Sequence, residues 1–152
     1  LTGLYNRRCF YQYIHNNRGG RTVSLMYIDL DRFKEVNDTY GHKVGDAVLV
    51  HTADVLRRLF RDDFVARLGG DEFLVVRLGK CSMDQMEQEA EAFLKEMRTA
   101  FLAAEQTVSL SASVGIAQSS DSMVDIDALL QRSDQALYQA KKAGRSRYCV
   151  YR

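Results

Sequence analysis

The residues most able to do chemistry in this chain stand beside a pair of glycines. Asp71 and Glu72 follow Gly69-Gly70, and apolar runs lie on both sides, at 64–66 and 73–76. Because glycine adopts positive φ freely, a Gly-Gly pair between two strand-like runs predicts a hairpin. Because the turn has no side chains, there is room beside the two carboxylates for a large anion, with a metal ion between the anion and the carboxylates. The stretch is either such a site or a solvated surface hairpin.

A second acidic pair follows another apolar run. Asp29 and Asp31 come directly after the run 23–28, which predicts a buried strand. Asp31 is expected to cap a helix that starts near Arg32. Asp29 is either a strand-end acid or a metal ligand. If Asp29 and Asp71 are adjacent, they form a hard oxygen site suited to Mg²⁺, which binds phosphates through one or two protein carboxylates.

Polar residues that suit a nucleotide follow in the next segments. Lys34 lies in a predicted first helical turn, where exposed N–H groups favour phosphate. Asn37 and Asp46 flank the glycine-containing stretch 41–45, and a carboxylate can accept from the N1–H and N2–H₂ donors of guanine. The alternatives are a surface lysine, a turn asparagine and a capping aspartate.

A cationic cluster stands near the end of the chain. It surrounds Gly144 and comprises Lys141, Lys142, Arg145 and Arg147. Cations at this position either complement the carboxyl end of a helix or clamp a triphosphate.

Periodicity predicts the elements that must position these residues. Helices are expected at 4–14, from about 32, at 46–59, 82–104 and 126–143, and strands at 23–28, on both sides of Gly69-Gly70, at 108–117 and at 148–151. Gly41 and Gly45 are expected to interrupt the helical segments. The order predicts an α/β fold of the α+β type, with a central, mostly antiparallel five-stranded sheet flanked by helices.

Length and composition favour one domain over residues 1–152. The chain is 46% hydrophobic and 27% charged with a net charge of +1, which is typical of a soluble protein and demands no nucleic-acid partner. It contains no apolar run of roughly 20 residues, so the domain itself is not expected to insert into a membrane. Three separated cysteines fit a reducing cytoplasm. Because the chain begins with Leu1, we expect it to be the C-terminal part of a longer sensor protein, which can be anchored at the inner membrane.

Five blocks of sequence carry a family resemblance. In order they are Leu1-Thr2-Gly3-Leu4-Tyr5-Asn6-Arg7-Arg8, Asp29-Leu30-Asp31-Arg32-Phe33-Lys34-Glu35-Val36-Asn37-Asp38, Gly41-His42-Lys43-Val44-Gly45-Asp46, Arg67-Leu68-Gly69-Gly70-Asp71-Glu72-Phe73, and Ala136-Leu137-Tyr138-Gln139-Ala140-Lys141 with Gly144-Arg145. Over essentially its whole length the chain resembles the GGDEF domain of the diguanylate cyclase family.

This resemblance implies a palm-like nucleotide cyclase fold and the reaction 2 GTP → cyclic di-GMP + 2 pyrophosphate. It implies Mg²⁺ as the cofactor, with Mn²⁺ as the alternative ion. One domain binds one GTP, so the twofold-symmetric product implies a homodimer of half-sites.

The resemblance also implies a role for each matching residue. The metal ligands would be Asp29, the Leu30 carbonyl and Asp71. In catalysis, Asp71 would be the base for the ribose 3′-hydroxyl, with Glu72 in support and Lys34 at the phosphates. The substrate contacts would be Asn37, Asp46, His42, Phe33, Lys141, Arg145, Gly69 and Gly70.

One position departs from the family pattern. Many members carry Arg-x-x-Asp, a product-binding inhibitory site, ending five residues before the glycine pair. Here Asp63 is retained, but Phe60 stands at the arginine position, and phenylalanine cannot make bidentate phosphate contacts. The inhibitory site is therefore expected to be non-functional unless Arg61 substitutes. Ser146, where the family often has Asn, is a mild change.

Three activities are compatible with these residues. The first is an active diguanylate cyclase. The second is a degenerate GGDEF domain that binds GTP or cyclic di-GMP, against which the intact Asp71 and Glu72 argue. The third is a palm-type cyclase that uses ATP, against which the guanine-reading pair Asn37 and Asp46 argues.

Overall fold

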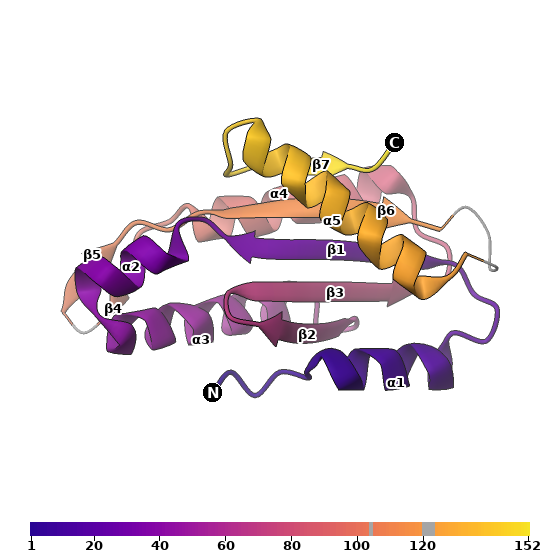
Figure 1. Ribbon diagram of the computed structural model, residues 1–152, viewed down its shortest axis with the longest axis horizontal. Helices are drawn as coiled ribbons and strands as arrows, with labels where there is room; N and C mark the ends of the chain where they lie inside the picture. The colour runs from indigo at the N-terminus through magenta and orange to yellow at the C-terminus, as the bar shows by residue number, and fades with distance from the viewer. Residues whose placement is uncertain (104, 120–123) are drawn as a thin grey trace.

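The chain folds around one five-stranded sheet (Figure 1), and the computed structural model describes residues 1–103, 105–119 and 124–152. The strand order is β2-β3-β1-β6-β7. All neighbours are antiparallel except β6 and β7, which are parallel. The predicted mostly antiparallel sheet is confirmed, and the last strand makes it mixed. The strands are β1 (Val23–Leu30), β2 (Phe64–Gly69), β3 (Glu72–Leu78), β6 (Ala112–Gln118) and β7 (Tyr148–Val150).

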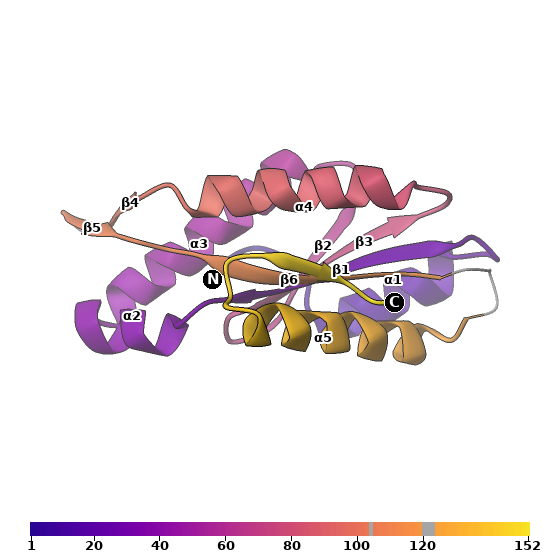
Figure 2. The ribbon, with the colours of Figure 1, turned by 90° about the horizontal axis from the view of Figure 1, so that it is seen from above.

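Helices cover both faces of the sheet (Figure 2). Two of them, α3 and α4, pack on one face, and α1 and α5 pack on the other. The short α2 leads from the end of β1 into α3. The helices are α1 (Arg7–Asn17), α2 (Phe33–Tyr40), α3 (His42–Leu59), α4 (Met83–Met97) and α5 (Ile126–Lys142).

The central strand β1 divides its side chains between two cores. Every residue of β1 is buried. Because successive side chains of a strand point to opposite faces, Met26 and Ile28 join the core under α3 and α4, whereas Leu25 and Tyr27 join the core under α1 and α5. Asp29, the residue before the last of β1, therefore lies on the face that α5 covers.

The first helix starts later than periodicity predicted. It begins at Arg7, where the Asn6 side chain accepts a hydrogen bond of 2.9 Å from the Cys9 N–H and caps the first turn. The residues before it run beside β2 instead, with the Arg67 N–H donating to the Tyr5 carbonyl at 2.8 Å. The apolar Leu4 and Tyr5 thus belong to the sheet edge rather than to the helical stripe.

Two further element boundaries differ from the prediction. The helix predicted at 82–104 ends at Met97, and Ala104 lies outside the described residues. It is followed by a two-stranded ribbon of β4 (Phe101–Ala103) and β5 (Gln106–Val108). The strand predicted at 108–117 is divided between the end of β5 and β6, because residues 109–111 carry the chain from the ribbon into the main sheet.

The glycines at 41 and 45 have different roles. Gly41 separates α2 from α3 with a φ of 91°, as a break should. Gly45, predicted to interrupt, lies inside α3, which begins at His42 and not at Asp46. A Cβ at Gly45 would lie 1.8 Å from the Asn37 Oδ1. The glycine therefore leaves room for the Asn37 side chain against α3.

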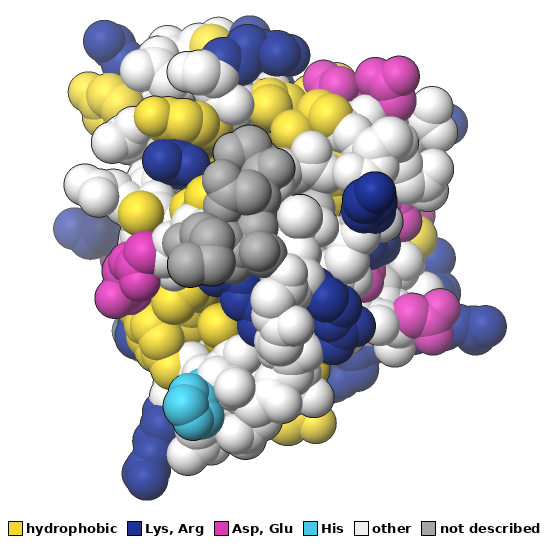
Figure 3. All heavy atoms as spheres, turned by 90° about the vertical axis from the view of Figure 1, so that its right-hand side faces the viewer, with side chains coloured by type: hydrophobic (Ala, Val, Ile, Leu, Met, Phe, Trp, Pro, Cys, Tyr) yellow, Lys and Arg dark blue, Asp and Glu magenta, His cyan; other side chains and the backbone are white. Residues whose placement is uncertain are grey.

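Figure 3 faces the end of the molecule opposite the β2–β3 turn, and basic, acidic and apolar side chains are interspersed over it. Positive charge is not gathered into one patch on this face. Within the described part of the chain, no helix is both long enough and apolar enough to cross a bilayer.

Candidate functional site

The candidate site lies where β1 ends beside the β2–β3 turn. Asp29 is paired with Glu72 in the antiparallel register, and the Leu30 N–H donates to the Asp71 carbonyl at 3.2 Å. The fold thus brings together the two acidic segments that the sequence keeps about forty residues apart. Leu30 itself is buried.

The hairpin turn is displaced by one residue from the predicted Gly-Gly turn. Gly69 ends β2 opposite Glu72, so the turn consists of Gly70 and Asp71. Gly69 and Gly70 have φ values of 152° and 51°, and a Cβ on either would meet no atom within 4 Å. These glycines are therefore required by the backbone conformation and leave open space beside Asp71.

Asp29 forms an ion pair with Lys141 of α5 through its Oδ2. Its other oxygen, Oδ1, is buried without a hydrogen-bond partner. Burial raises the pKa of Asp29 to about 6, with Asp71 nearby adding to the increase and Lys141 opposing it. Burying a carboxylate oxygen without a partner costs free energy, so a cation or a hydrogen-bond donor beside this atom would be stabilising.

The donor set fits a hard divalent cation. Asp29 and Asp71 offer carboxylate oxygens, and such oxygens are the ligands that Mg²⁺ takes in proteins. Among the described residues, no group of three or more His, Cys, Asp or Glu side chains is arranged to hold a metal ion. A magnesium ion held here would thus depend on backbone oxygen, water or phosphate for its remaining ligands.

Glu72 is oriented by a tyrosine that the sequence did not single out. The Tyr27 hydroxyl donates to Glu72 Oε1 at 3.3 Å. Burial, with Glu72 nearby, raises the pKa of Tyr27 to about 12, so the hydroxyl keeps its proton. Tyr27 and Asp29 are two residues apart on one strand, and this alternation is the signal that could have identified Tyr27.

The two candidate guanine contacts come from neighbouring helices. Asn37 of α2 lies against the α3 backbone at Gly45, and Asp46 follows on α3 as an exposed side chain. Phe33 lies beside the same glycine, 3.4 Å from a Cβ built there. The structure thus gathers an amide, a carboxylate and an aromatic ring around the start of α3.

The other predicted phosphate and substrate contacts are exposed. Lys34 projects from α2, His42 begins α3, and Arg145 lies in the loop after α5. Lys141, predicted to hold terminal phosphates, lies at the carboxylate of Asp29 in this structure. The Lys141 ammonium therefore offsets the negative charge of Asp29, and the side chain is half-buried rather than extended into solvent.

Asp31 does not cap the following helix. The residue before α2 is Arg32, in the left-handed region with a φ of 55°, and no side chain caps that helix end. The Asp31 carboxylate instead accepts hydrogen bonds from the hydroxyls of Ser111 (2.6 Å) and Ser113 (2.7 Å) and from the Ser146 N–H (3.0 Å). The prediction was wrong because these tertiary donors outcompete the local helix N–H groups.

The residues of the family's inhibitory motif are engaged within the chain. Phe60 is buried in the core under α3 and α4. The Asp63 carboxylate accepts two hydrogen bonds from the Arg77 guanidinium, at 2.9 and 2.6 Å, and Arg77 also pairs with Glu89. These carboxylates raise the pKa of Arg77 above its ordinary value. Asp63 thus serves as a structural partner of β3 and α4.

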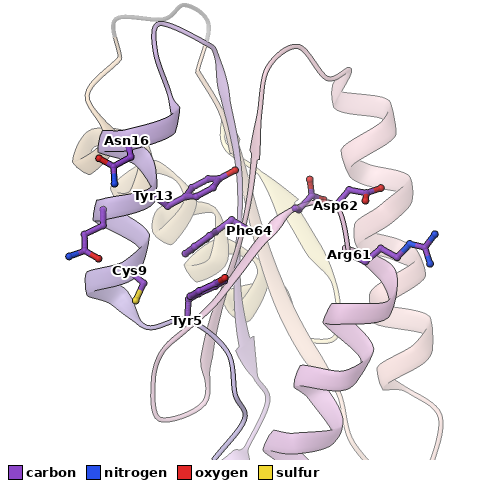
Figure 4. A pocket seen from close by; sticks show the side chains of 9 residues that line it. Tyr5, Cys9, Tyr13, Asn16, Arg61, Asp62 and Phe64 are labelled. Atoms are coloured by element: carbon purple, nitrogen blue, oxygen red, sulfur yellow. The ribbon is translucent and has the colours of Figure 1, made fainter.

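A cavity of about 430 Å³ lies beside these residues, between α1 and the start of β2 (Figure 4). Its wall is a stack of three rings, with Phe64 4.8 Å from Tyr5 and 4.4 Å from Tyr13. Arg61 is exposed, and its side chain points away from these rings in Figure 4. In this conformation Arg61 does not replace the missing arginine of the motif.

Comparison with known proteins agrees with the sequence blocks. The family model described as "Diguanylate cyclase, GGDEF domain" matches residues 1–147. The chain is 39% identical to the cyclic di-GMP phosphodiesterase PdeR of Escherichia coli, covering 99% of this chain and 23% of that protein. It is 36% identical to the diguanylate cyclase DgcS of Shewanella oneidensis, covering 97% of this chain and 50% of that protein. It therefore spans half or less of these two relatives.

Among solved structures, the GGDEF domain of PA1120 (YfiN or TpbB) from Pseudomonas aeruginosa superposes with a TM-score of 0.88 at 35% identity, covering 100% of this chain and 99% of that one. The likeness therefore extends over the whole fold described above, including the β2–β3 turn and α5. Because the family model and this structural likeness both cover nearly every residue, the chain belongs to the GGDEF domain family.

Proposed function

We propose that this chain is a diguanylate cyclase that condenses two GTP molecules into cyclic di-GMP and releases two pyrophosphates. The observation that carries the proposal is the buried, unpartnered Oδ1 of Asp29 beside Asp71, at the end of β1. An acidic pair of this kind, with open space beyond Gly69 and Gly70, suits a nucleotide triphosphate that arrives with its cation. The name of the relative DgcS supports the same activity.

In the proposed reaction, the ribose 3′-oxygen of one GTP attacks the α-phosphorus of the other. The new bond joins that oxygen to phosphorus, and the bond from phosphorus to pyrophosphate breaks. The 3′-oxygen of the second GTP then attacks the α-phosphorus of the first in the same way, which closes the ring and releases the second pyrophosphate. Asp71 accepts the proton of the 3′-hydroxyl. Mg²⁺, or Mn²⁺ in its place, would be held by Asp29, Asp71 and the Leu30 carbonyl, where it would neutralise phosphate charge and lower the pKa of the hydroxyl.

The other residues of the site act by binding and orientation. Asn37 and Asp46 hydrogen-bond the guanine edge, with Phe33 and His42 beside it. Lys34, Lys141 and Arg145 neutralise the phosphates, and Glu72 supports the metal site from its hydrogen bond with Tyr27. Phosphoryl transfer depends mainly on such positioning and charge neutralisation, so the set requires no covalent intermediate.

The product has twofold symmetry, and one site holds one GTP. We therefore propose that the active species is a homodimer in which two sites face each other. We also propose that residues 1–152 form one catalytic domain of a larger protein, which agrees with the share of PdeR and DgcS that the chain spans.

A second candidate function is a GGDEF domain that only binds GTP or cyclic di-GMP. The similarity to PdeR, a protein named as a phosphodiesterase, is the observation in its favour. The intact Gly69-Gly70-Asp71-Glu72 signature favours the cyclase instead.

Incubation of the chain with GTP and Mg²⁺ tests the proposal, with cyclic di-GMP and pyrophosphate both quantified over a series of protein concentrations. The cyclase predicts two pyrophosphates per cyclic di-GMP and a specific activity that rises with protein concentration as dimers form. ATP in place of GTP is the matched control and should give no cyclic product. GTP binding without turnover at concentrations that dimerise the chain would favour the second candidate.

A further inference from the structure

The loop that follows α5 contains two consecutive residues in an unfavourable backbone conformation. Arg145 and Ser146 have φ values of 62° and 50°, in the left-handed region, and neither is glycine. Side chains of L-residues crowd the backbone in this region, so such residues persist only where surrounding contacts hold them. Arg145 is one of the residues proposed above to bind phosphates.

Asp31 holds this loop from the end of β1. Its Oδ2 accepts a hydrogen bond from the Ser146 N–H at 3.0 Å. The carboxylate is itself fixed by the hydroxyls of Ser111 and Ser113, at 2.6 and 2.7 Å. Asp31 thus ties the loop to the strand that carries Asp29, two residues away.

Arg98 holds the same residue from the end of α4. Its Nη2 donates to the Ser146 carbonyl at 2.6 Å, and its Nε donates to the Ser146 Oγ at 3.0 Å. Its third nitrogen, Nη1, pairs with Glu91 at 2.9 Å. The N–H, the carbonyl and the hydroxyl of Ser146 are therefore all bound, by groups from two separate elements.

The ends of the loop are fixed as well. The Arg145 N–H donates to the Ala140 carbonyl at 3.0 Å, which closes the carboxyl end of α5. The Val114 N–H donates to the Arg147 carbonyl at 3.0 Å, which starts the pairing of β6 with β7. The first contact closes the helix and the second begins the strand pairing. Neither of them accounts for the binding of all three polar groups of Ser146.

We propose that Asp31 and Arg98 are positioning residues that hold Arg145 and Ser146 in the left-handed conformation and so fix Arg145 for the triphosphate of the nucleotide. The identity of the ligand rests on the proposed function. A loop that is already ordered does not lose conformational entropy when the nucleotide binds. Loss of the contacts from Asp31 and Arg98 should therefore weaken nucleotide binding without altering the chemical step.

Arg98 offers the cleaner test, because Asp31 is two residues from a proposed metal ligand. Arg98→Ala removes three hydrogen-bonding nitrogens from the surface and leaves Ser146 strained. Asparagine adopts the left-handed region more readily than serine does. Ser146→Asn in the Arg98→Ala background should therefore restore the loop without restoring its contacts. Arg58→Ala is the matched control, because Arg58 is an exposed arginine of α3 that pairs with Glu96 of α4.

The measurements are the dissociation constant of GTP with Mg²⁺ by calorimetry, KM and kcat for GTP, and amide hydrogen exchange over residues 144–147. For Arg98→Ala we expect a dissociation constant and KM raised about tenfold, kcat within about twofold and faster exchange in the loop. The double variant should recover most of the affinity and the protection. Arg58→Ala should match the unsubstituted chain.

Unchanged GTP affinity in Arg98→Ala would overturn the inference, as would a loss that Ser146→Asn does not restore. A fall in kcat with unchanged KM would contradict a positioning role as well. If the unsubstituted chain binds no GTP, the proposed function is wrong, and so is the assignment of Arg145 to the triphosphate. Hydrogen exchange needs no nucleotide, so it decides separately whether Arg98 holds the loop.

Discussion

Lys141 on α5 and Asp29 on β1 stand 112 residues apart in the sequence and form an ion pair at the centre of the candidate site. Burial of Asp29 raises the pKa of its carboxyl group, and the lysine ammonium opposes that increase. The pair therefore links the position of α5 to the charge of the acidic site.

Replacement of Lys141 by methionine should lower the catalytic efficiency with GTP. The methionine keeps most of the apolar stem but leaves the buried Asp29 without its cation, and it removes a charge that phosphates need. We expect kcat/KM for GTP to fall roughly tenfold or more. Steady-state kinetics at saturating Mg²⁺ measures the effect.

Lys142→Met is the matched control for that variant. Lys142 is the next residue on α5, is exposed, and lies 5.7 Å from the centre of the Tyr138 ring instead of at the acidic pair. It should retain nearly full kcat/KM. Equal losses in the two variants would show that general positive charge, rather than the pair with Asp29, matters.

Gly45→Ala should weaken GTP binding more than it weakens the fold. The added Cβ would overlap the end of the Asn37 side chain, which can rotate away. The helix itself gains about 1 kcal/mol from the alanine, which offsets part of the strain. We expect the GTP dissociation constant to rise while the denaturation midpoint changes little. A variant that binds GTP normally would remove Asn37 from the proposed guanine contacts.

Gly115→Ala should weaken the fold more than it weakens GTP binding. A Cβ at this β6 position would lie 2.1 Å from the Ser133 carbonyl oxygen and 2.3 Å from the Leu137 nitrogen, so the α5 backbone would have to move. We expect a loss of about 3 kcal/mol in the free energy of unfolding, measured by chemical denaturation. An alanine variant as stable as the unsubstituted chain would mean that α5 does not pack on β6 as closely as described.

Much of this arrangement could be predicted from the sequence, because local signals and fold agreed. Buried strands such as 23–28 were visible as continuous apolar runs, and the Gly-Gly pair marked the hairpin. The five blocks then set the family and the candidate residues. Each of these signals depends on neighbours within a few positions, which is the range over which sequence patterns are informative.

The contacts that periodicity could not predict are those set by packing between distant segments. Asp31 resembled a helix cap, yet its partners are serines about 80 and 115 residues later in the chain. Gly45 resembled a break, yet it lies inside α3, where the Asn37 side chain of α2 approaches it. In both cases a tertiary contact outweighed the local preference of the residue.

Product inhibition through the inhibitory motif should be weak or absent. Phe60 is buried and offers no phosphate contact, and the Asp63 carboxylate is already bound by Arg77. Cyclic di-GMP added to the GTP assay should therefore leave the initial rate nearly unchanged. Strong inhibition that disappears in an Asp63→Ala variant, while an Asp62→Ala variant keeps it, would contradict this expectation.

Asp29 and Asp71 are proposed to support metal-dependent synthesis of cyclic di-GMP where β1 ends beside the β2–β3 turn. The most direct test compares product formation from GTP and Mg²⁺ by the unsubstituted chain and by Asp71→Asn, which preserves size and removes the charge. We expect cyclic di-GMP from the first, none after addition of a chelator, and a rate lowered at least about a hundredfold in the variant. Full activity of Asp71→Asn would contradict the proposed function, as would no product from the unsubstituted chain at concentrations at which it is shown to dimerise.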